Sequence, residues 1–256
     1  MPSVAIIIPT TGAAALRQCI TSVLAQQGGP DIKLFIVIDG PEFAEAFRHT
    51  TAGLDLRGVH ICQLPANVGR NGFYGHRVYA AFSHLIDTDY VCFLDQDNWL
   101  DPGHVASLVD AIVQQDWDWA FALRKVVSAD GLYLVDDESQ SVGPWGQAQP
   151  MPLVDTNCYC LRTEVAQRVA SHWHGGWGQD RVFYAALSHT FPNFGSSGRY
   201  TVHYRTRDDM QAAVTGLLTR ENARQQLRFP DGLPWVGAAV AARTAASAFT
   251  ASAAPT

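Results

Sequence analysis

The stretch that decides the fold of this chain is "FLDQDNWLDP", Phe93–Pro102. Apolar residues lead into it, as in a strand that has crossed a hydrophobic core, and the acids Asp95, Asp97 and Asp101 follow at once. A carboxylate that leaves water must be paired, protonated or bound to a cation, because an isolated charge is costly to bury. The stretch therefore predicts a buried strand that ends at a site for something positively charged.

Three further apolar runs precede this one: "VAIIIP" (4–9), "KLFIVIDG" (33–40) and "VHICQLP" (59–65). Between them, apolar residues recur at helical spacing from Leu16 to Gln27 and again from Phe73 to Leu85. Strands that are apolar throughout and separated by helices indicate a parallel sheet covered on both faces. Such sheets bind ligands beyond the carboxyl ends of their strands, here Pro9–Thr11, Asp39–Gly40 and Asp95–Asp97.

The second half of the chain is less regular. Strands of a more open, partly antiparallel region are predicted at 119–127, 132–137 and 154–162, and helices around 164–170, 180–187 and 210–225. Asp101 is predicted to cap a helix, because Pro102 follows it. The predicted fold is α/β, with a mostly parallel central sheet flanked by helices and a smaller mixed or antiparallel region. A single domain spans 1–230, and the Ala-rich segment 231–256 is predicted to be a flexible tail.

Composition excludes several classes of protein. The net charge is −6 and no run of five Lys or Arg occurs, so nucleic acid is not an expected partner. Five cysteines without a CxxC pair are typical of a reduced compartment. The N-terminus lacks the features of a signal peptide, and no apolar stretch nears the roughly 18 residues of a transmembrane segment. We expect a soluble cytoplasmic protein, with contact to a membrane surface left open.

The Asp-x-Asp spacing admits two interpretations. In an extended segment, side chains two residues apart point to the same side, so Asp95 and Asp97 can converge on one divalent cation that prefers oxygen ligands. Alternatively, Asp95 caps a turn and Asp97 is solvated. The triplet alone leaves both open.

Five motifs in order, over about residues 4–210, resemble GT-A fold glycosyltransferases, in particular glycosyltransferase family 2. They are "VAIIIPTTG" with "LRQCITSVLAQ", "VIDG", "NVGRNGFYGHR", "FLDQDNWLDP" and "GGWGQD". The resemblance implies a GT-A, Rossmann-like fold, with a nucleotide-binding half at about 1–100 and an acceptor half at about 101–230. It implies a hexosyltransferase-type enzyme that moves a sugar from a nucleotide-diphosphate sugar, with UDP favoured, to an acceptor hydroxyl with inversion.

The resemblance also implies a donor site. Its residues are Pro9, Thr10, Thr11, Asp39, Asn67, Arg70, Arg77, Asp95, Gln96 and Arg205. Asp39 lines up with the acid that accepts from the imide N–H of uracil or thymine, although it also suits the cap of a turn. Thr11 equally fits a simple turn, and Arg77 a surface arginine.

A metal site and a catalytic base are implied next. Asp95, Asp97 and His203 would hold Mg²⁺ or Mn²⁺, with His203 otherwise a packed or solvent-facing side chain. Asp180 would be the general base of the inverting reaction, unless it only caps the helix that follows. Trp173, Trp177, Gly176 and Gln179 would form a sugar platform, although burial is the commoner role of a tryptophan.

Two departures from the family pattern keep a different class open. Ile38 stands where the family has the first acid of Asp-Asp-Gly-Ser, and Gln179 stands where it usually has Glu. A catalytically silent nucleotide-sugar-binding protein is therefore the alternative. A sugar-1-phosphate nucleotidyltransferase is less favoured, because "PTTGAAALRQ" has a single glycine after the first strand. The acceptor stays open among glycans, lipid-linked intermediates and small molecules.

Overall fold

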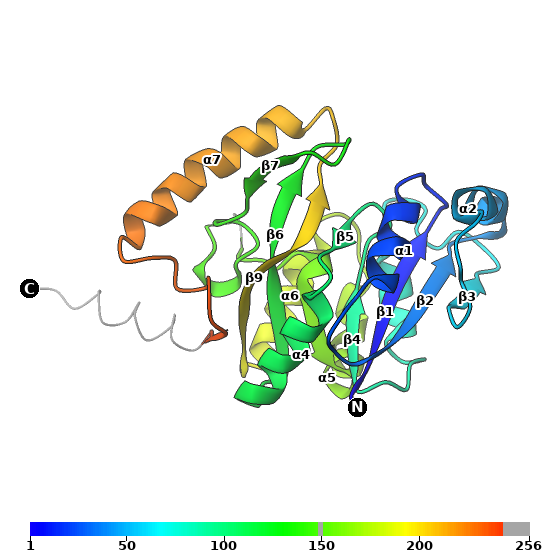
Figure 1. Ribbon diagram of the computed structural model, residues 1–256, viewed down its shortest axis with the longest axis horizontal. Coiled ribbons are helices and arrows are strands. Elements are labelled where there is room, and N and C mark those ends of the chain that lie inside the picture. Colours follow the sequence, from blue (N-terminus) through cyan, green and yellow to red (C-terminus); the bar gives the residue numbers. More distant parts are fainter. Residues whose placement is uncertain (148–150, 243–256) are drawn as a thin grey trace, which may run out of the picture.

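The computed structural model describes residues 1–147 and 151–242, which form one ten-stranded sheet with helices packed against it (Figure 1). The strands are β1 Ser3–Thr10, β2 Asp31–Ile38, β3 His60–Gln63, β4 Tyr90–Phe93, β5 Trp99–Leu100, β6 Trp119–Val127, β7 Tyr133–Asp136, β8 Tyr159–Arg162, β9 Phe194–Arg205 and β10 Val240–Ala241. The α-helices are α1 Leu16–Leu24, α2 Ala44–Thr51, α3 His76–Phe82, α4 His104–Gln115, α5 Thr163–Val169, α6 Gln179–Thr190 and α7 Gln211–Arg228. Short 3₁₀ helices lie at Pro41–Phe43, Gly143–Trp145, Thr156–Cys158 and Ala170–Trp173.

The sheet runs in the order β10-β9-β6-β8-β4-β1-β2-β3, with β5 beside β9 and β7 beside β6. From β3 to β4 the strands are parallel, as their apolar sequences predict, and the edge strand β3 is exposed. β8 is antiparallel to both β4 and β6, and β9 is again parallel to β6. The predicted α/β class, with a parallel region joined to a mixed one, is therefore confirmed.

The parallel half is closed on both faces. Ile6, Ile7 and Ile8 are all fully buried, and successive strand residues point to opposite faces. In the other half, α4 packs on β6 and β9, and α5 packs on β4 and β8. Helix α7 lies along β7 at one end of the molecule, where Asn222 donates to Asp136 O and accepts from Glu138 N–H (Figure 1). Helices thus pack against β4 and against the strands on either side of it.

Asp101 does not cap α4, contrary to the sequence prediction. The helix begins at His104 after Gly103, with no side-chain cap. Pairing of β5 with β9 instead brings the Asp101 carboxylate to His203 Nε2 (2.7 Å) and to Lys125 Nζ (2.8 Å). Two side-chain partners, one of them the charged Lys125, hold the carboxylate more strongly than one backbone N–H would.

The predicted flexible tail begins too early at residue 231. Trp235 is fully buried, with its ring against Trp145 and Phe229, and β10 pairs with β9. Two aromatic contacts and a strand pair are enough to order this part of an otherwise Ala-rich segment. The rest of the predicted tail, 243–256, lies outside the described residues.

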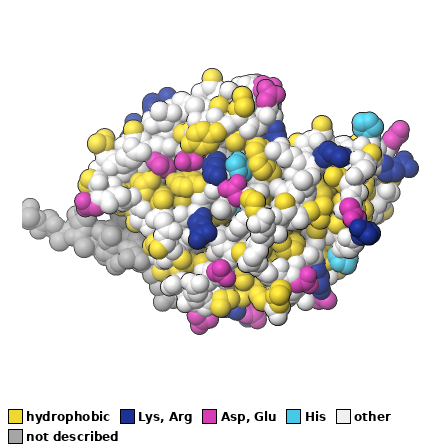
Figure 2. All heavy atoms as spheres, in the orientation of Figure 1, with side chains coloured by type: hydrophobic (Ala, Val, Ile, Leu, Met, Phe, Trp, Pro, Cys, Tyr) yellow, Lys and Arg dark blue, Asp and Glu magenta, His cyan; other side chains and the backbone are white. Residues whose placement is uncertain are grey.

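The distribution of charge on the surface agrees with the composition, which predicts no strongly basic face. On the face seen in Figure 2, acidic and basic side chains are interspersed rather than gathered by sign. Within 1–147 and 151–242, no helix combines the length and the apolar character needed to cross a bilayer.

A buried histidine makes the stability of the fold depend on pH. His104 is fully buried beside Thr201 Oγ1, and burial lowers the pKa of its imidazole to about 3. Between that value and the ordinary pKa of about 6.5, the unfolded chain binds a proton that the native chain does not. We expect the free energy of unfolding to fall as the pH decreases below about 6.5, by up to about 1.4 kcal/mol per pH unit from this group.

Urea denaturation of the wild type and His104→Gln between pH 4.5 and 7.5 measures this contribution, since Gln can still hydrogen-bond Thr201. The variant should show the shallower pH slope, and His84→Gln, at an exposed position, should keep the wild-type slope. Equal slopes for the wild type and His104→Gln would contradict the assignment.

Candidate active site

The carboxyl ends of three parallel strands open into one cleft of about 800 Å³. Thr10 ends β1, Asp39 follows β2, and Asp95 follows β4 within two residues. Asp180, from the start of α6, lies on another wall of the same cleft. The volume is in the range of small-molecule sites, and its position is the one expected for a ligand of a parallel sheet.

Gln96 joins the loops after β1 and β4. Its Oε1 accepts from Thr10 Oγ1 (2.7 Å) and Thr11 N–H (3.0 Å), and its Nε2 donates to Thr11 Oγ1 (3.0 Å). All three residues line the cleft, as does Pro9. These three hydrogen bonds therefore fix the Asp-x-Asp segment to the end of the first strand.

Asp39 holds the loop that follows β3. Its two carboxylate oxygens accept from the backbone N–H groups of Val68 (2.7 Å) and Gly69 (2.9 Å). A Cβ on Gly69 would lie 2.6 Å from Asp39 Oδ2 and 2.2 Å from Tyr74 O, so only glycine fits. Burial raises the pKa of Asp39, although these two N–H groups oppose the rise. The carboxylate still lines the cleft beside Asn67 and Arg70.

Asp95 is clamped from two sides. Tyr79 on α3 donates to Asp95 Oδ1 (2.8 Å), and Asn157 Nδ2 donates to Oδ2 (3.1 Å). Asn157 Oδ1 also accepts from Asp95 N–H (2.6 Å). Because Asn157 precedes β8, this contact ties the mixed half of the sheet to the parallel half.

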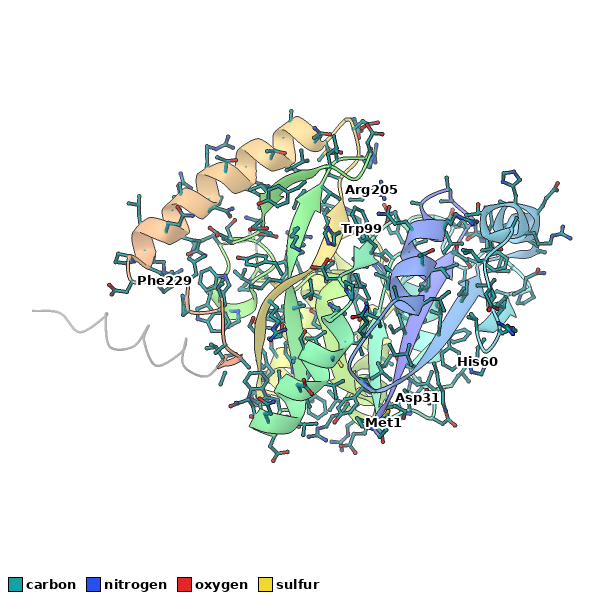
Figure 3. All side chains as sticks on the ribbon, in the orientation of Figure 1. Met1, Asp31, His60, Trp99, Arg205 and Phe229 are labelled. Carbon is teal, nitrogen blue, oxygen red and sulfur yellow. The ribbon has the colours of Figure 1, made fainter. Side chains whose placement is uncertain are left out.

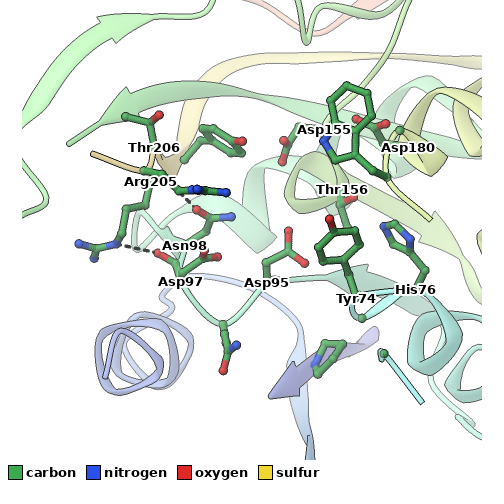
Figure 4. A pocket seen from close by; sticks show the side chains of 18 of the residues that line it. Tyr74, His76, Asp95, Asp97, Asn98, Asp155, Thr156, Asp180, Arg205 and Thr206 are labelled. Atoms are coloured by element: carbon green, nitrogen blue, oxygen red, sulfur yellow. Dashed lines mark hydrogen bonds between the residues drawn. The ribbon is translucent and has the colours of Figure 1, made fainter. Parts of the chain in front are cut away.

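Arg205 braces the Asp97 segment. Its Nε donates to Asp97 O (2.9 Å), its Nη1 to Ala129 O and its Nη2 to Gln18 Oε1, and its backbone N–H donates to Asn98 Oδ1 (Figure 4). Its guanidinium also lies over the Trp99 ring (Figure 3). Arg205 lines the cleft as predicted, but its guanidinium nitrogens are engaged with protein oxygens.

Three carboxylates of the cleft, those of Asp95, Asp97 and Asp180, have raised pKa values. Burial, with Asp97 and Asp155 nearby, raises the pKa of Asp95 to about 7. Burial also raises the pKa of Asp97, and burial together with Asp155 raises that of Asp180. Such pKa shifts are concentrated at functional sites, and these groups face one another across the cleft (Figure 4).

Arg124, a largely buried arginine in the wall of the cleft, holds two aspartates in place between these acids. Arg124 Nε donates to Asp137 (2.7 Å) and its Nη1 to Asp155 (2.6 Å). Asp155 Oδ1 in turn accepts from Asn157 Nδ2 (2.7 Å), the same amide that clamps Asp95. A chain of charge-assisted hydrogen bonds thus runs from β6 to the end of β4.

Only one residue of the predicted sugar platform lines the cleft among the described residues. Trp177 is 86% exposed and lines the cleft. Trp173 is fully buried and stacks on Phe183, so its assignment to the platform was wrong. Gln179 Nε2 donates to His172 O, and a Cβ on Gly176 would meet Gly72 O. Neither Gln179 nor Gly176 is among the described residues that line the cleft; both shape the loop that carries Trp177.

Two further predicted residues lie apart from the cleft lining. Arg77 donates to Val68 O (3.3 Å) and lies over the Phe73 ring, 3.4 Å from its centroid. His203 stacks on Trp99 and pairs with Asp101. The structure gives Arg77 the role of a loop brace, and His203 that of a partner of Asp101.

The predicted three-residue metal set is not assembled. Across the described part of the chain, no three Asp, Glu, His or Cys side chains are grouped to hold a metal ion. Asp97 and Asp95 remain as adjacent oxygen donors in the cleft. Mg²⁺ typically needs only one or two protein carboxylates when substrate phosphates complete its shell, so the donor set fits a cation that binds together with a diphosphate.

The sequence did not predict several residues of the site. Tyr74, Arg124, Asp155, Arg181 and Tyr204 line the cleft, and Tyr79 and Asn157 support it. One signal was available: the polar triplet Asp155–Asn157 interrupts the otherwise apolar "LVDTNCYCL".

The sequence profile of glycosyl transferase family 2 matches residues 5–150 of this chain. The chain belongs to glycosyl transferase family 2. This match covers more than half of the chain and includes the loops that carry Thr10, Asp39 and Asp95. It confirms the family that the sequence motifs indicate.

Structural comparison shows the fold. TarS 1-349 of S. aureus in complex with UDP-GlcNAc has a TM-score of 0.60 at 13% identity, over 83% of this chain and 61% of that chain. The complex of TarS 1-349 with UDP has a TM-score of 0.58 at 14% identity, over 86% and 65%. The GT-A fold is thereby confirmed. The chain spans less than two thirds of either TarS chain.

One curated protein of Haemophilus influenzae, described as uncharacterized, is 40% identical over 61 residues. That match covers 24% of this chain and 41% of the other protein.

The Asn157 clamp is testable by stability. Asn157→Ala leaves the buried N–H of Asp95 and one Asp95 oxygen without their partner, which costs about 1–3 kcal/mol per unsatisfied group. We expect the free energy of unfolding in urea to fall by at least about 1 kcal/mol. Gln114→Ala on the exposed face of α4 should stay within about 0.5 kcal/mol of the wild type. An unchanged Asn157→Ala protein would show that the clamp contributes nothing.

Proposed function

We propose that this chain is an inverting glycosyltransferase that uses a nucleoside-diphosphate sugar, with UDP favoured, and a divalent cation. One observation carries the proposal: the acids after β2 and β4 share a single cleft with a carboxylate from α6. Along the cleft, this arrangement offers a place first for a nucleobase, then for a diphosphate and then for an acceptor. Family membership and the nucleotides named for TarS support it.

The donor would lie along the carboxyl ends of β1, β2 and β4. Thr10, Thr11 and Asp39 would contact the nucleoside, with the rigid Gln96 link setting their spacing. Asn67 and Arg70, in the loop held by Asp39, would contact the base or the diphosphate. In this scheme Arg205 acts indirectly, because it holds the backbone at Asp97 rather than a phosphate.

Asp97, with Asp95 beside it, would hold Mg²⁺ or Mn²⁺. The bound cation would supply positive charge against the phosphate oxygens of the leaving group. Asp95 is less free to turn than Asp97, because Tyr79 and Asn157 occupy one position on each of its oxygens. Asp97 is therefore the principal ligand in the proposal.

Asp180 would take the proton of the acceptor hydroxyl. As that oxygen bonds to the anomeric carbon, the bond from this carbon to the diphosphate breaks, and the nucleoside diphosphate leaves with the electron pair. Burial raises the pKa of Asp180 and so makes it a stronger base than an exposed aspartate. Trp177 would cover one face of the sugar or acceptor.

A thermal-shift screen tests the donor assignment. UDP-, GDP- and dTDP-sugars are added with and without Mn²⁺, and binding to the native state raises the melting temperature. We expect the largest rise with a UDP-sugar and Mn²⁺ together. Loss of the UDP shift in Asp39→Ala, but not in the exposed control Asp130→Ala, would support a donor site that is organised by Asp39. If no nucleotide sugar raises the melting temperature, the proposal fails.

Turnover separates an enzyme from a silent binding protein. With the donor that the screen selects, Asp97→Asn and Asp180→Asn should each lower the rate of sugar release by about 10²–10³. Liquid chromatography of the released nucleoside diphosphate is the measurement. A wild type that binds the donor but releases no nucleotide, with or without acceptors, would favour the silent alternative.

A further inference from the structure

Five arginines line the cleft, and three of them are already engaged. Arg124 pairs with two aspartates, Arg205 donates to three protein oxygens, and Arg207 forms a bidentate pair with Asp209. Arg70 lies in the loop that Asp39 holds, at the proposed position of the nucleotide. Arg181 is the remaining one, at the Asp180 end of the cleft.

The guanidinium of Arg181 is incompletely satisfied. Its side chain is 19% exposed, and its Nε is buried without a hydrogen-bond partner among the described residues. Among residues 1–147 and 151–242 it forms an ion pair with Asp180, at 3.7 Å between Nη1 and Oδ1. A buried charged donor without an acceptor is costly. A ligand with oxygen atoms can reach the part of the side chain that stays exposed in the cleft, where it would improve the hydrogen bonding of the guanidinium.

We propose that the acceptor carries an oxyanion, a phosphate or a carboxylate, next to the hydroxyl that is glycosylated, and that Arg181 binds this group. The inference rests on the function proposed above and specifies its acceptor. The planar fork of an arginine matches both oxyanions with two hydrogen bonds. Asp180 Oδ1 and Arg181 Nη1 are 3.7 Å apart, so the hydroxyl and the oxyanion must be close neighbours in the acceptor.

The surroundings of Arg181 agree with an anionic group at this place. Gly178 is the N-cap of α6, and Asp180 and Arg181 lie in its first turn, where the positive end of the helix dipole favours negative charge. Asp155 is already paired with Arg124, which limits its repulsion of an incoming oxyanion. Asp180 is the remaining nearby acid, and it is the residue that must meet the hydroxyl.

An oxyanion bound to Arg181 would also affect Asp180, the proposed general base. The charge of Arg181 lowers the pKa of Asp180, against the larger effect of burial. An oxyanion bound to Arg181 would offset part of that charge, so the proton affinity of Asp180 would rise once the acceptor is in place. A neutral acceptor would lack this effect as well as the contact itself.

Binding of minimal acceptors tests the inference. The full chain is saturated with UDP and the diamagnetic Mg²⁺, so that the diphosphate position is filled, and the dissociation constants of sn-glycerol 3-phosphate, glycerate and glycerol are measured by ligand-observed NMR. We expect at least one anionic probe to bind about 10- to 100-fold more tightly than glycerol. The better anion shows whether the group is a phosphate or a carboxylate.

Variants identify the residue responsible. Arg181→Gln should abolish the preference for the anionic probe, and Arg181→Lys should keep part of it, because charge remains while the fork is lost. Arg168→Gln, on the exposed face of α5, should keep the wild-type preference. The UDP-induced shift in melting temperature checks that each variant is folded.

The outcomes separate this inference from the proposed function. If UDP fails to bind the wild type, the donor site is wrong. If UDP binds but the three probes bind equally, or Arg181→Gln retains the preference, the anionic acceptor is refuted while the donor site stands.

Discussion

The fold and the site both depend on one constraint, which is that the half-buried Asp95 must be held at the end of β4. A carboxylate in that position is tolerated because Tyr79 and Asn157 hydrogen-bond to its oxygens, and Asn157 also satisfies its backbone N–H. These partners come from α3 and from the segment before β8. The two halves of the sheet must therefore be assembled correctly before the acid can be accommodated.

The same network brings a cost in stability. Asp95, Asp97 and Asp180 all have raised pKa values, chiefly through burial. Acids held together in this way destabilise the ligand-free chain, and a cation or a proton relieves the repulsion. Functional sites commonly store such strain, and the rest of the fold compensates for it. The fully buried β1 and the stacked Trp119 and Phe194 provide part of that compensation.

Much of the architecture follows from the sequence, because buried parallel strands have a clear pattern. The runs around Ile7, Ile36 and Cys92 predicted the parallel half, and with it the edge at which Thr10, Asp39 and Asp95 meet. Side-chain packing was less predictable. Trp173 and Trp177 are four residues apart in a similar sequence context, yet one is in the core and the other is exposed. Asp101 and His203 paired with each other because β5 joins β9, a contact between distant segments that no local pattern shows.

The strand β10 gives the Ala-rich end of the chain an unexpected importance. It covers part of β9, pairing with Gly195 and Ser196, while Trp235 fills the space beside Trp145. Without residues 231–242, that stretch of β9 would present unpaired N–H and C=O groups next to a bare tryptophan. An open strand edge of this kind invites pairing with other chains. Protection of this strand edge therefore depends on a segment whose composition suggests that it is dispensable.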